Sequence, residues 1–189
     1  MKKLKHSLSL ILCFSFLFGF YLVSQVVNAG TNSSFVDISA HWAEKVITDW
    51  VELGLISGYP DGTFRPDQEI TRAEFIALVN RAFGYKTTTA YNFSDVKPDD
   101  WFAAEIGKAQ VQGYIGGYPD GTVKPNNPIT RQEVASILVK ILEPKRTQLN
   151  LSAKFIDSDA IPEWSRAAIN DIVNLNYMGG YPDSTFRPT

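Results

Sequence analysis

The stretch Gly58–Pro66, which reads Gly-Tyr-Pro-Asp-Gly-Thr-Phe-Arg-Pro, decides the fold because the chain contains two further copies of it, at residues 117–125 and 180–188. In each copy the proline fixes φ at the first corner of a turn, and the aspartate suits the second corner. Glycine accepts the positive φ that follows, and Ser184 replaces it in the third copy, at a cost of about 1 kcal/mol if the conformation is kept. An internal repeat makes the repeat the structural unit. Repeated units more often present binding surfaces than catalytic sites.

A helical segment is predicted before each turn. Each repeat opens with Phe-x-Asp, and a tryptophan follows. In the first repeat, apolar side chains three and four residues apart predict one face of a helix. They are Trp42, Val46, Trp50 and Leu53. Glycine, or asparagine as the next best choice, suits the left-handed residue that ends many helices. Gly54, Gly113 and Asn176 stand at that place.

A second helix is predicted after the first two turns. Thr71-Arg72-Ala73-Glu74 and its equivalent at 130–133 form capping boxes, in which the threonine accepts from a backbone amide and the glutamate reaches back. The apolar face of such a helix needs a neighbouring repeat to cover it. The third repeat reaches Thr189 without this helix, so either the sequence is a fragment or another chain completes the repeat. The sequence predicts an all-α fold of tandem helix-loop-helix repeats with long turn-rich loops.

Residues 1–29 are predicted to be a secretory signal peptide. Three lysines precede an apolar run, and Val27-Asn28-Ala29 supplies the small residues of a cleavage site. An uncleaved membrane anchor is the alternative, because the apolar run approaches the length that spans a bilayer. Cys13, the only cysteine, lies in this segment, so the mature chain is expected to have no disulfide and no thiolate metal site.

The charge of the mature chain argues against nucleic acid as a partner. The signal peptide removes three of the 18 Lys and Arg and none of the 20 Asp and Glu, which leaves a net charge of −5. Nucleic-acid binding needs a basic stripe instead. The mature length suffices for one domain with a modest core.

Arg72 and Arg131 break a local rule, because each stands at the first position of a predicted helix, where partial positive charge favours acids. Such sites are often functional. A guanidinium beside free backbone amides forms a cradle for a carboxylate or phosphate. The alternative is that each arginine pairs with a nearby acid, such as Asp67 or Glu74 in the case of Arg72. The residues alone leave both interpretations open.

The repeated aromatic residues also have two interpretations. A tryptophan at a helix start is more often part of a core than a platform for a sugar ring. The turn tyrosines are expected to be more exposed, and they suit either stacking on a ring or packing within the loop. The tryptophans are Trp42, Trp101 and Trp164, and the tyrosines are Tyr59, Tyr118 and Tyr181.

The order of these motifs resembles the S-layer homology (SLH) module. Phe-x-Asp, His41-Trp42-Ala43, the Gly-Tyr-Pro-Asp-Gly turn and Ile-Thr-Arg-x-Glu follow one another as in that family. The resemblance implies module 1 at 35–84, module 2 at 93–142 and a truncated module 3 at 155–189, arranged as a pseudo-threefold bundle. It also implies a secreted protein of the cell surface that is anchored non-covalently to the cell wall or S-layer.

The resemblance further implies the ligand and its contacts. Family members bind secondary cell-wall polymers, often through a pyruvate ketal on a terminal amino sugar, in grooves between modules. A ketal pyruvate is a carboxylate, which suits an arginine at a helix start. The implied glycan-binding residues are Arg72 and Arg131, Trp42, Trp101 and Trp164, and the pairs Gly58-Tyr59, Gly117-Tyr118 and Gly180-Tyr181. Because module 3 lacks the arginine motif, one groove is expected to lack its cation.

Other classes of protein fit the sequence less well. His41 is the only histidine of the mature chain, and nucleophile-elbow, phosphate-loop and zinc-protease motifs are missing, so we expect neither enzymatic activity nor a cofactor. A calcium loop is disfavoured because the Asp-Gly turn lacks alternating acids. Two alternatives stay open. The chain either self-associates through its incomplete third module or forms the N-terminal part of a larger S-layer protein or exported enzyme.

Overall fold

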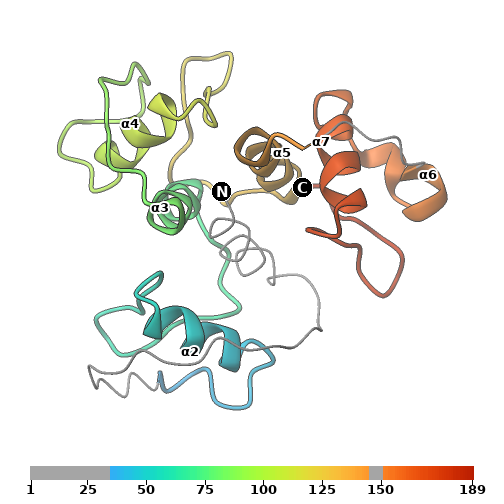
Figure 1. Cartoon of the computed structure of the whole chain (residues 1–189), viewed down its shortest axis with the longest axis horizontal. Helices are drawn as coiled ribbons and strands as arrows, with labels where there is room; N and C mark the ends of the chain where they lie inside the picture. The colour runs from blue at the N-terminus through green and yellow to red at the C-terminus, as the bar shows by residue number, and fades with distance from the viewer. Residues whose placement is uncertain (1–34, 145–150) are drawn as a thin grey trace. The chain divides into compact units, whose positions relative to one another are not determined.

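The computed structural model describes residues 35–144 and 151–189, and the predicted signal peptide lies outside them. All regular secondary structure in these residues is helical, apart from one isolated antiparallel bridge between Thr71 and Pro128 (Figure 1). The all-α prediction is therefore confirmed. The described residues divide into two compact units, 35–68 and 69–189, and the pseudo-threefold arrangement remains a prediction. No helix in the described ranges is both long and apolar enough to cross a membrane.

Helix α2 (Glu44–Glu52) forms the centre of the unit 35–68. The helical face predicted from the sequence is wrong at two positions, because Trp42 is 68% exposed and Leu53 is 61% exposed. Trp42 precedes the first helical residue and therefore lies outside the helical register. Ile47 and Trp50, three residues apart, make the buried side instead.

Left-handed residues end the first helix of each module, as predicted. The φ angle is +67° at Gly54, +73° at Gly113 and +58° at Asn176. After Gly54, the Leu55 amide turns back and donates to the Trp50 carbonyl at 2.9 Å. This bond satisfies a carbonyl that the end of the helix would otherwise leave unpaired.

The unit 69–189 contains the other helices that the structure describes. They are α3 (Arg72–Phe83), α4 (Ala103–Val111), α5 (Arg131–Leu142), the short α6 (Leu151–Lys154), a 3-10 turn at Ser158–Ala160, and α7 (Glu163–Asn174). Helix α3 packs against α4, and α5 packs against α7 (Figure 1). The second helix of one module thus packs against the first helix of the next, which confirms that these helices need a neighbouring repeat.

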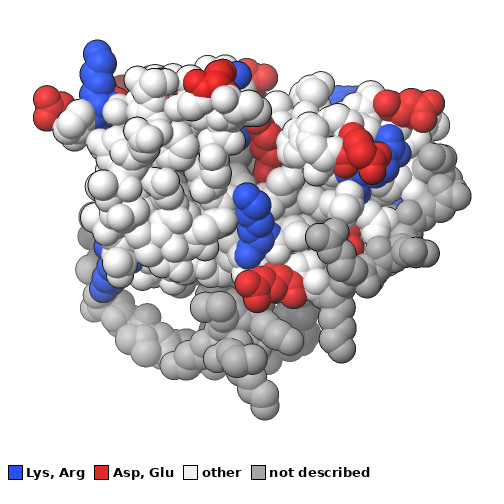
Figure 2. Space-filling view, turned by 90° about the horizontal axis from the view of Figure 1, so that it is seen from above, with Lys and Arg blue, Asp and Glu red and all other residues white. Residues whose placement is uncertain are grey.

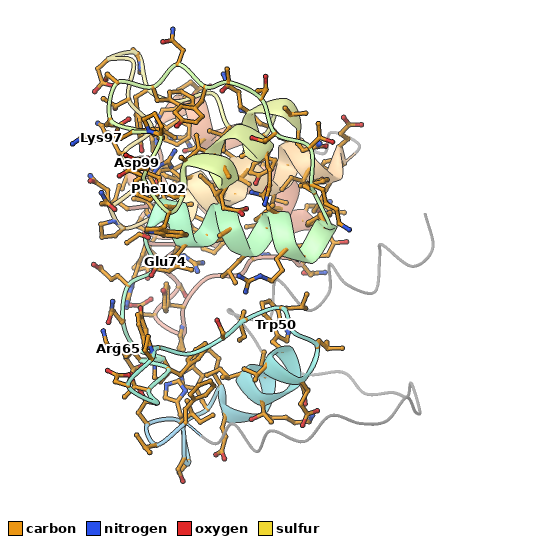
Figure 3. The ribbon with its side chains drawn as sticks, turned by 90° about the vertical axis from the view of Figure 1, so that its left-hand side faces the viewer. Trp50, Arg65, Glu74, Lys97, Asp99 and Phe102 are labelled. Carbon is orange, nitrogen blue, oxygen red and sulfur yellow. The ribbon has the colours of Figure 1, made fainter. Side chains whose placement is uncertain are left out.

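Two apolar clusters hold these helix pairs together. In the first cluster, Ile76 of α3 packs with Phe102, which lies over α3 at the start of α4 (Figure 3). In the second cluster, Leu138 of α5 packs with Ile169 of α7. Burying one such side chain contributes about 1.5–3 kcal/mol. The clusters therefore hold α3 on α4 and α5 on α7.

The aspartate of each Phe-x-Asp motif holds the turn of its own module. The Asp37 carboxylate accepts hydrogen bonds from the Phe64 amide at 2.9 Å and from the Arg65 amide at 2.6 Å. Asp95 and Asp157 accept equivalent pairs in modules 2 and 3. Arg65 has a left-handed φ of +59°, and the two bonds stabilise that unfavourable conformation. The repeat pattern alone does not reveal this role.

The phenylalanine of the same motif explains the glycine before each turn tyrosine. Each ring lies so close to its glycine that a Cβ there would overlap the ring and the carbonyl of the turn threonine. The contacts are Phe35 with Gly58, Phe93 with Gly117, and Phe155 with Gly180. Packing therefore requires these three glycines, and their implied contact with a glycan stays a prediction.

Ser184 keeps the conformation of the glycines that it replaces. The φ angle is +63° at Ser184, against +81° at Gly62 and +78° at Gly121. The Thr185 amide donates to Asp183 at 3.0 Å, as the equivalent amides do in the other two turns. The backbone strain expected from the sequence is therefore present at this serine.

Candidate functional site

Arg72, the first residue of α3, lies against the turn of module 2. Its Nε donates to the Val123 carbonyl at 2.9 Å, and its Nη1 lies 3.2 Å from Glu133 Oε1. Its Cζ is 5.0 Å from the centroid of the Tyr118 ring. Only 7% of the Arg72 side chain is exposed. Arg72 is thus a buried, ion-paired cation that joins one module to the next.

Glu133 is the acid at the centre of this junction. Its Oε1 also accepts a hydrogen bond from the Tyr118 hydroxyl, and its Oε2 accepts one from the Thr130 amide at 3.0 Å. Burial raises the pKa of Glu133, but these hydrogen bonds and the charge of Arg72 outweigh it, so the pKa lies below its ordinary value. Burial and the bond to Glu133 raise the pKa of Tyr118 to about 12. A neutral phenol and a carboxylate therefore face the guanidinium.

The backbone amides at the start of α3 are occupied. The Arg72 amide donates to the Asn127 carbonyl and the Ala73 amide to the Pro125 carbonyl, both at 2.9 Å. These two amides are therefore not free to bind an anion, so the carboxylate or phosphate cradle considered from the sequence is not formed at α3. The acid that pairs with Arg72 is Glu133, which comes from the next module and is neither of the two acids suggested by sequence proximity.

Arg131, the first residue of α5, repeats this arrangement against the turn of module 3. Its Nε donates to the Phe186 carbonyl at 2.8 Å and its Nη2 to the Gly179 carbonyl at 2.5 Å. Its Cζ lies 5.0 Å from the centroid of the Tyr181 ring. Burial lowers the pKa of Arg131, because removal from water disfavours the charged form.

One contact of the Arg72 site is missing at Arg131. Among the residues that the structure describes, no Asp or Glu lies within ion-pair distance of the Arg131 guanidinium. Its partners are neutral carbonyls and aromatic rings. Within these residues, Arg131 is therefore a partly buried cation without a direct ion pair, although the charge of the Asp157 carboxylate acts on it and partly opposes the lowering of its pKa by burial.

A further cation lies over each turn tyrosine. The cation-to-centroid distances are 4.0 Å for Arg65 over Tyr59, 4.2 Å for Lys124 over Tyr118, and 4.1 Å for Arg187 over Tyr181. Contacts of this kind are worth roughly 0.5–1 kcal/mol at exposed sites. Sequence reasoning missed these cations, although every copy of the repeated stretch has Lys or Arg before its last proline.

The turn aspartates accompany these cations. Arg65 Nη2 donates to Asp61 and Arg187 Nη2 to Asp183, at 2.8 and 2.7 Å. Hydrogen bonds from the turn threonine and from the arginine lower the pKa of Asp61 and of Asp183 to about 2. Both turns therefore present an ionised, paired surface at neutral pH.

The repeated tryptophans lie on the surface. The exposed fractions of Trp42, Trp101 and Trp164 are 68%, 61% and 59%. The expectation that they belong to the core is wrong, because each stands at or before the first turn of its helix, outside the buried face. The expectation that the tyrosines are the more exposed aromatic residues is wrong too, since even Tyr181 is only 37% exposed.

The surface beside Trp42 is hollowed. A shallow pocket of about 390 Å³ is bordered by Trp42, His41, Glu44, Lys45, Thr48 and Asp49. The His41 ring lies 5.3 Å from the Trp42 ring, centroid to centroid. An exposed ring among polar groups suits an amphipathic ligand such as a sugar.

The structure thus brings each arginine to a tyrosine of the next module, Arg72 to Tyr118 and Arg131 to Tyr181. In residues 35–144 and 151–189, no hydrogen bond or ring contact joins either arginine to Trp101 or Trp164. Charged side chains on the face shown in Figure 2 are dispersed, with acidic and basic groups beside one another. The candidate site therefore consists of separate aromatic and cationic parts.

The family model of the S-layer homology domain matches three segments of the chain, residues 34–76, 92–135 and 154–189. Each segment contains a Phe-x-Asp motif, a surface tryptophan and a Gly-Tyr-Pro-Asp turn. This chain belongs to the S-layer homology family. The matched segments contain the three turns and the inter-module arginines Arg72 and Arg131.

Relatives of this SLH chain are longer proteins. Cell surface glycoprotein 1 of Acetivibrio thermocellus is 37% identical over 145 residues, which cover 70% of this chain and 6% of the glycoprotein. The cellulosome-anchoring protein of the same organism is 36% identical over 139 residues, which cover 70% of this chain and 31% of that protein. An amylopullulanase of Thermoanaerobacterium thermosulfurigenes is 33% identical over 162 residues, or 83% of this chain and 9% of the enzyme. The SLH chain thus spans less than a third of each of these relatives.

Proposed function

We propose that this chain anchors itself, or a longer protein that contains it, to the bacterial cell wall by binding a secondary cell-wall polysaccharide non-covalently. The observation that carries the proposal is the set of three exposed tryptophans at equivalent positions of a chain of the SLH family. Relatives named cellulosome-anchoring protein, middle cell wall protein and surface layer protein fit the same role at the cell surface.

The ligand is proposed to be the pyruvylated terminal amino sugar of the polymer, bound in grooves between modules. The indole faces of Trp42, Trp101 and Trp164 offer stacking surfaces for sugar rings. The pairs Gly58-Tyr59, Gly117-Tyr118 and Gly180-Tyr181 are proposed as the groove walls. Arg72 and Arg131 are proposed as the source of positive charge for the carboxylate. Of these two, Arg131 is the stronger candidate, because Glu133 already balances Arg72.

The proposed activity is binding without catalysis. The amylopullulanase and exoglucanase relatives share only 9% and 14% of their length with this chain. In the described ranges, no three His, Cys, Asp or Glu side chains are close enough to hold a metal ion. The enzymes among the relatives support the proposal that a module of this kind attaches a separate effector region to the cell wall.

Co-sedimentation of the exported chain with purified cell walls tests this proposal. We expect the chain to pellet with walls that carry a pyruvylated secondary polymer, and to stay in solution after mild acid has removed the ketal pyruvate. The double variant Trp101→Ala/Trp164→Ala should bind at least about tenfold more weakly, since ring stacking contributes at the level of 1 kcal/mol or more per ring.

Leu53→Ala is the matched control, because Leu53 is also exposed and apolar but lies outside the aromatic motif. Equal binding by the tryptophan variant and the control would contradict the assignment of the indoles. Undiminished binding to walls stripped of the whole polymer would overturn the proposed function.

A further inference from the structure

Two helix pairs of the unit 69–189 join successive modules, α3 with α4 and α5 with α7. The repeat defines equivalent positions in the two interfaces. Val79 of α3 corresponds to Leu138 of α5, and both are 1% exposed. Ile106 of α4 corresponds to Ile169 of α7, and both are 0% exposed. Since the two interfaces agree at these positions, the positions at which they differ distinguish one pair from the other.

The start of α3 and the start of α5 pack against residues of different size. In the α3–α4 interface a small residue, Ala73, shares the apolar cluster with a large one, Phe102, which lies over α3 (Figure 3). At the equivalent positions of the α5–α7 interface, Gln132 is the large residue and Ser165 the small one. The Ser165 hydroxyl donates to Gln132 Oε1 at 3.3 Å. All four residues are buried, so size and polarity are exchanged between the two interfaces.

A second set of equivalent positions shows the same exchange of size. Ile76 of α3 and Ala109 of α4 belong to the first apolar cluster. The equivalent residues Ala135 of α5 and Ile172 of α7 belong to the second. The exposed fraction of all four is 0%. Each interface thus contains one isoleucine and one alanine, but on opposite helices, and a close-packed interior is sensitive to such a difference.

The α3–α4 interface also contains a buried polar network. The Asn80 Oδ1 accepts from the Tyr114 hydroxyl at 2.6 Å, and its Nδ2 donates to the Glu105 carbonyl at 2.9 Å and to Glu105 Oε2 at 2.7 Å. Asn80 and Tyr114 are each 1% exposed. In the α5–α7 interface, Val139 and Ala168 stand at the places of Asn80 and Glu105. A buried hydroxyl or amide that loses its partner is costly.

A wrong pairing of these helices would bring incompatible residues together. Pairing α5 with α4 would place two large residues together at the first set of positions and two alanines at the second. It would also place Val139 where the Tyr114 hydroxyl now finds its acceptor. Pairing α3 with α7 would place two small residues together at the first set and two isoleucines at the second. Voids, overpacking and unpaired buried groups all destabilise an interface.

We propose that these residues select the partner of each helix, so that α3 pairs with α4, α5 pairs with α7, and the modules assemble in the order of the chain. Selection of this kind is a difference in stability between the correct and the wrong pairing. It matters in a repeat protein because equivalent helices are prone to wrong assembly. The inference rests on the packing of the helices and is independent of the proposed glycan ligand.

Exchanges of residues between equivalent helices test the proposal without changing the amino-acid composition of the chain. The first variant exchanges α3 and α5 residues through Ala73→Gln, Ile76→Ala, Gln132→Ala and Ala135→Ile. The second variant exchanges α4 and α7 residues through Phe102→Ser, Ala109→Ile, Ser165→Phe and Ile172→Ala. The third variant combines both exchanges, so that each set of matching residues moves to the other interface.

Thermal unfolding of the exported chain measures the fit in each variant. We expect the first and the second variant each to lower Tm by at least about 5 °C, because each creates misfits in both interfaces. The third variant should recover at least about half of the summed loss in Tm. Independent substitutions would lose stability additively instead.

The matched control exchanges exposed residues between the same two helices, through Arg81→Lys and Lys140→Arg. It should leave Tm within about 1 °C of the wild type. A loss in the third variant equal to the sum of the other two, or a first variant as stable as the wild type, would overturn the proposal. If a fourfold exchange prevents folding, Ala73→Gln/Gln132→Ala with and without Phe102→Ser/Ser165→Phe provides the same comparison.

Discussion

Arg72 and Arg131 occupy the same position of the repeat, but their surroundings differ by one carboxylate. Both guanidinium groups donate Nε to a carbonyl of the next module and lie over its turn tyrosine. Of the two, Arg72 is the one that forms an ion pair within the described residues, with Glu133. The same residue of the same motif therefore has an ion pair in one module and neutral direct partners, two carbonyls and the tyrosine ring, in the next, within the described residues.

Acid is expected to weaken the closed junction. The pKa of Glu133 lies below its ordinary value of 4.5 in the folded chain, so the unfolded chain takes up the proton first as the pH falls. The stability that this group contributes is thus present above about pH 4.5 and is lost as the pH falls through the folded pKa. Urea unfolding between neutral pH and pH 3 should show a smaller acid loss for Glu133→Gln than for the wild type.

Glu69→Gln serves as the control for this measurement, because Glu69 is exposed. Its acid dependence should follow that of the wild type. The same pH dependence in the wild type and in Glu133→Gln would show that the junction does not depend on the ionised carboxylate.

The turn is the element whose contacts are the same in all three modules. An aspartate from Phe-x-Asp binds its amides, a phenylalanine packs on its glycine, and a cation lies over its tyrosine. Its conformation holds even where Ser184 has to adopt φ +63°. The contacts around the turn therefore outweigh the local preference of a serine.

Replacing Ser184 by glycine is expected to stabilise the chain by about 0.5–1 kcal/mol. Glycine adopts the left-handed conformation without the steric cost of a side chain, although it loses more entropy on folding. The reverse changes, Gly62→Ser and Gly121→Ser, should destabilise it by a similar amount. Thermal and urea unfolding measure both effects. Destabilisation by Ser184→Gly would mean that the serine side chain has a role beyond the turn conformation.

In residues 69–189, the modules are stabilised by packing between a helix of one module and a helix of the next. Helix α3 packs on α4, and α5 packs on α7. Each interface has its own apolar cluster. Repeat proteins of this kind are stabilised by contacts between neighbours rather than by one shared core.

Deleting residues 151–189 should therefore loosen α5 more than α3. The deletion removes Ile169 and the rest of α7, which cover Leu138 of α5, and leaves the packing of Ile76 on α4 in place. Amide hydrogen exchange should show faster exchange over 131–142 and little change over 72–83. Equal loss of protection in both helices would indicate that the two clusters unfold as one cooperative unit.

Much of this fold follows from local patterns in the sequence. The left-handed residues at Gly54, Gly113 and Asn176 and the all-α class were predictable, because backbone conformation and helical periodicity are set by neighbouring residues. The buried face of α2 was not. Trp42 lies two residues before the first residue of α2, so it does not follow the helical register. Sequence patterns place a helix start only to within one or two residues, and an error of that size decides whether Trp42 is predicted to be buried or exposed.

The sequence by itself determined the repeat, its turns, its helices and its membership of a family, because these depend on residues within one stretch of chain. The tertiary structure alone decided which charged and aromatic side chains come into contact. Glu133 comes from the next module and pairs with Arg72, and the carbonyls of Asn127 and Pro125 occupy the backbone amides at the start of its helix. The charge of a buried group depends on every group packed around it, and folding brings those groups together from distant parts of the chain.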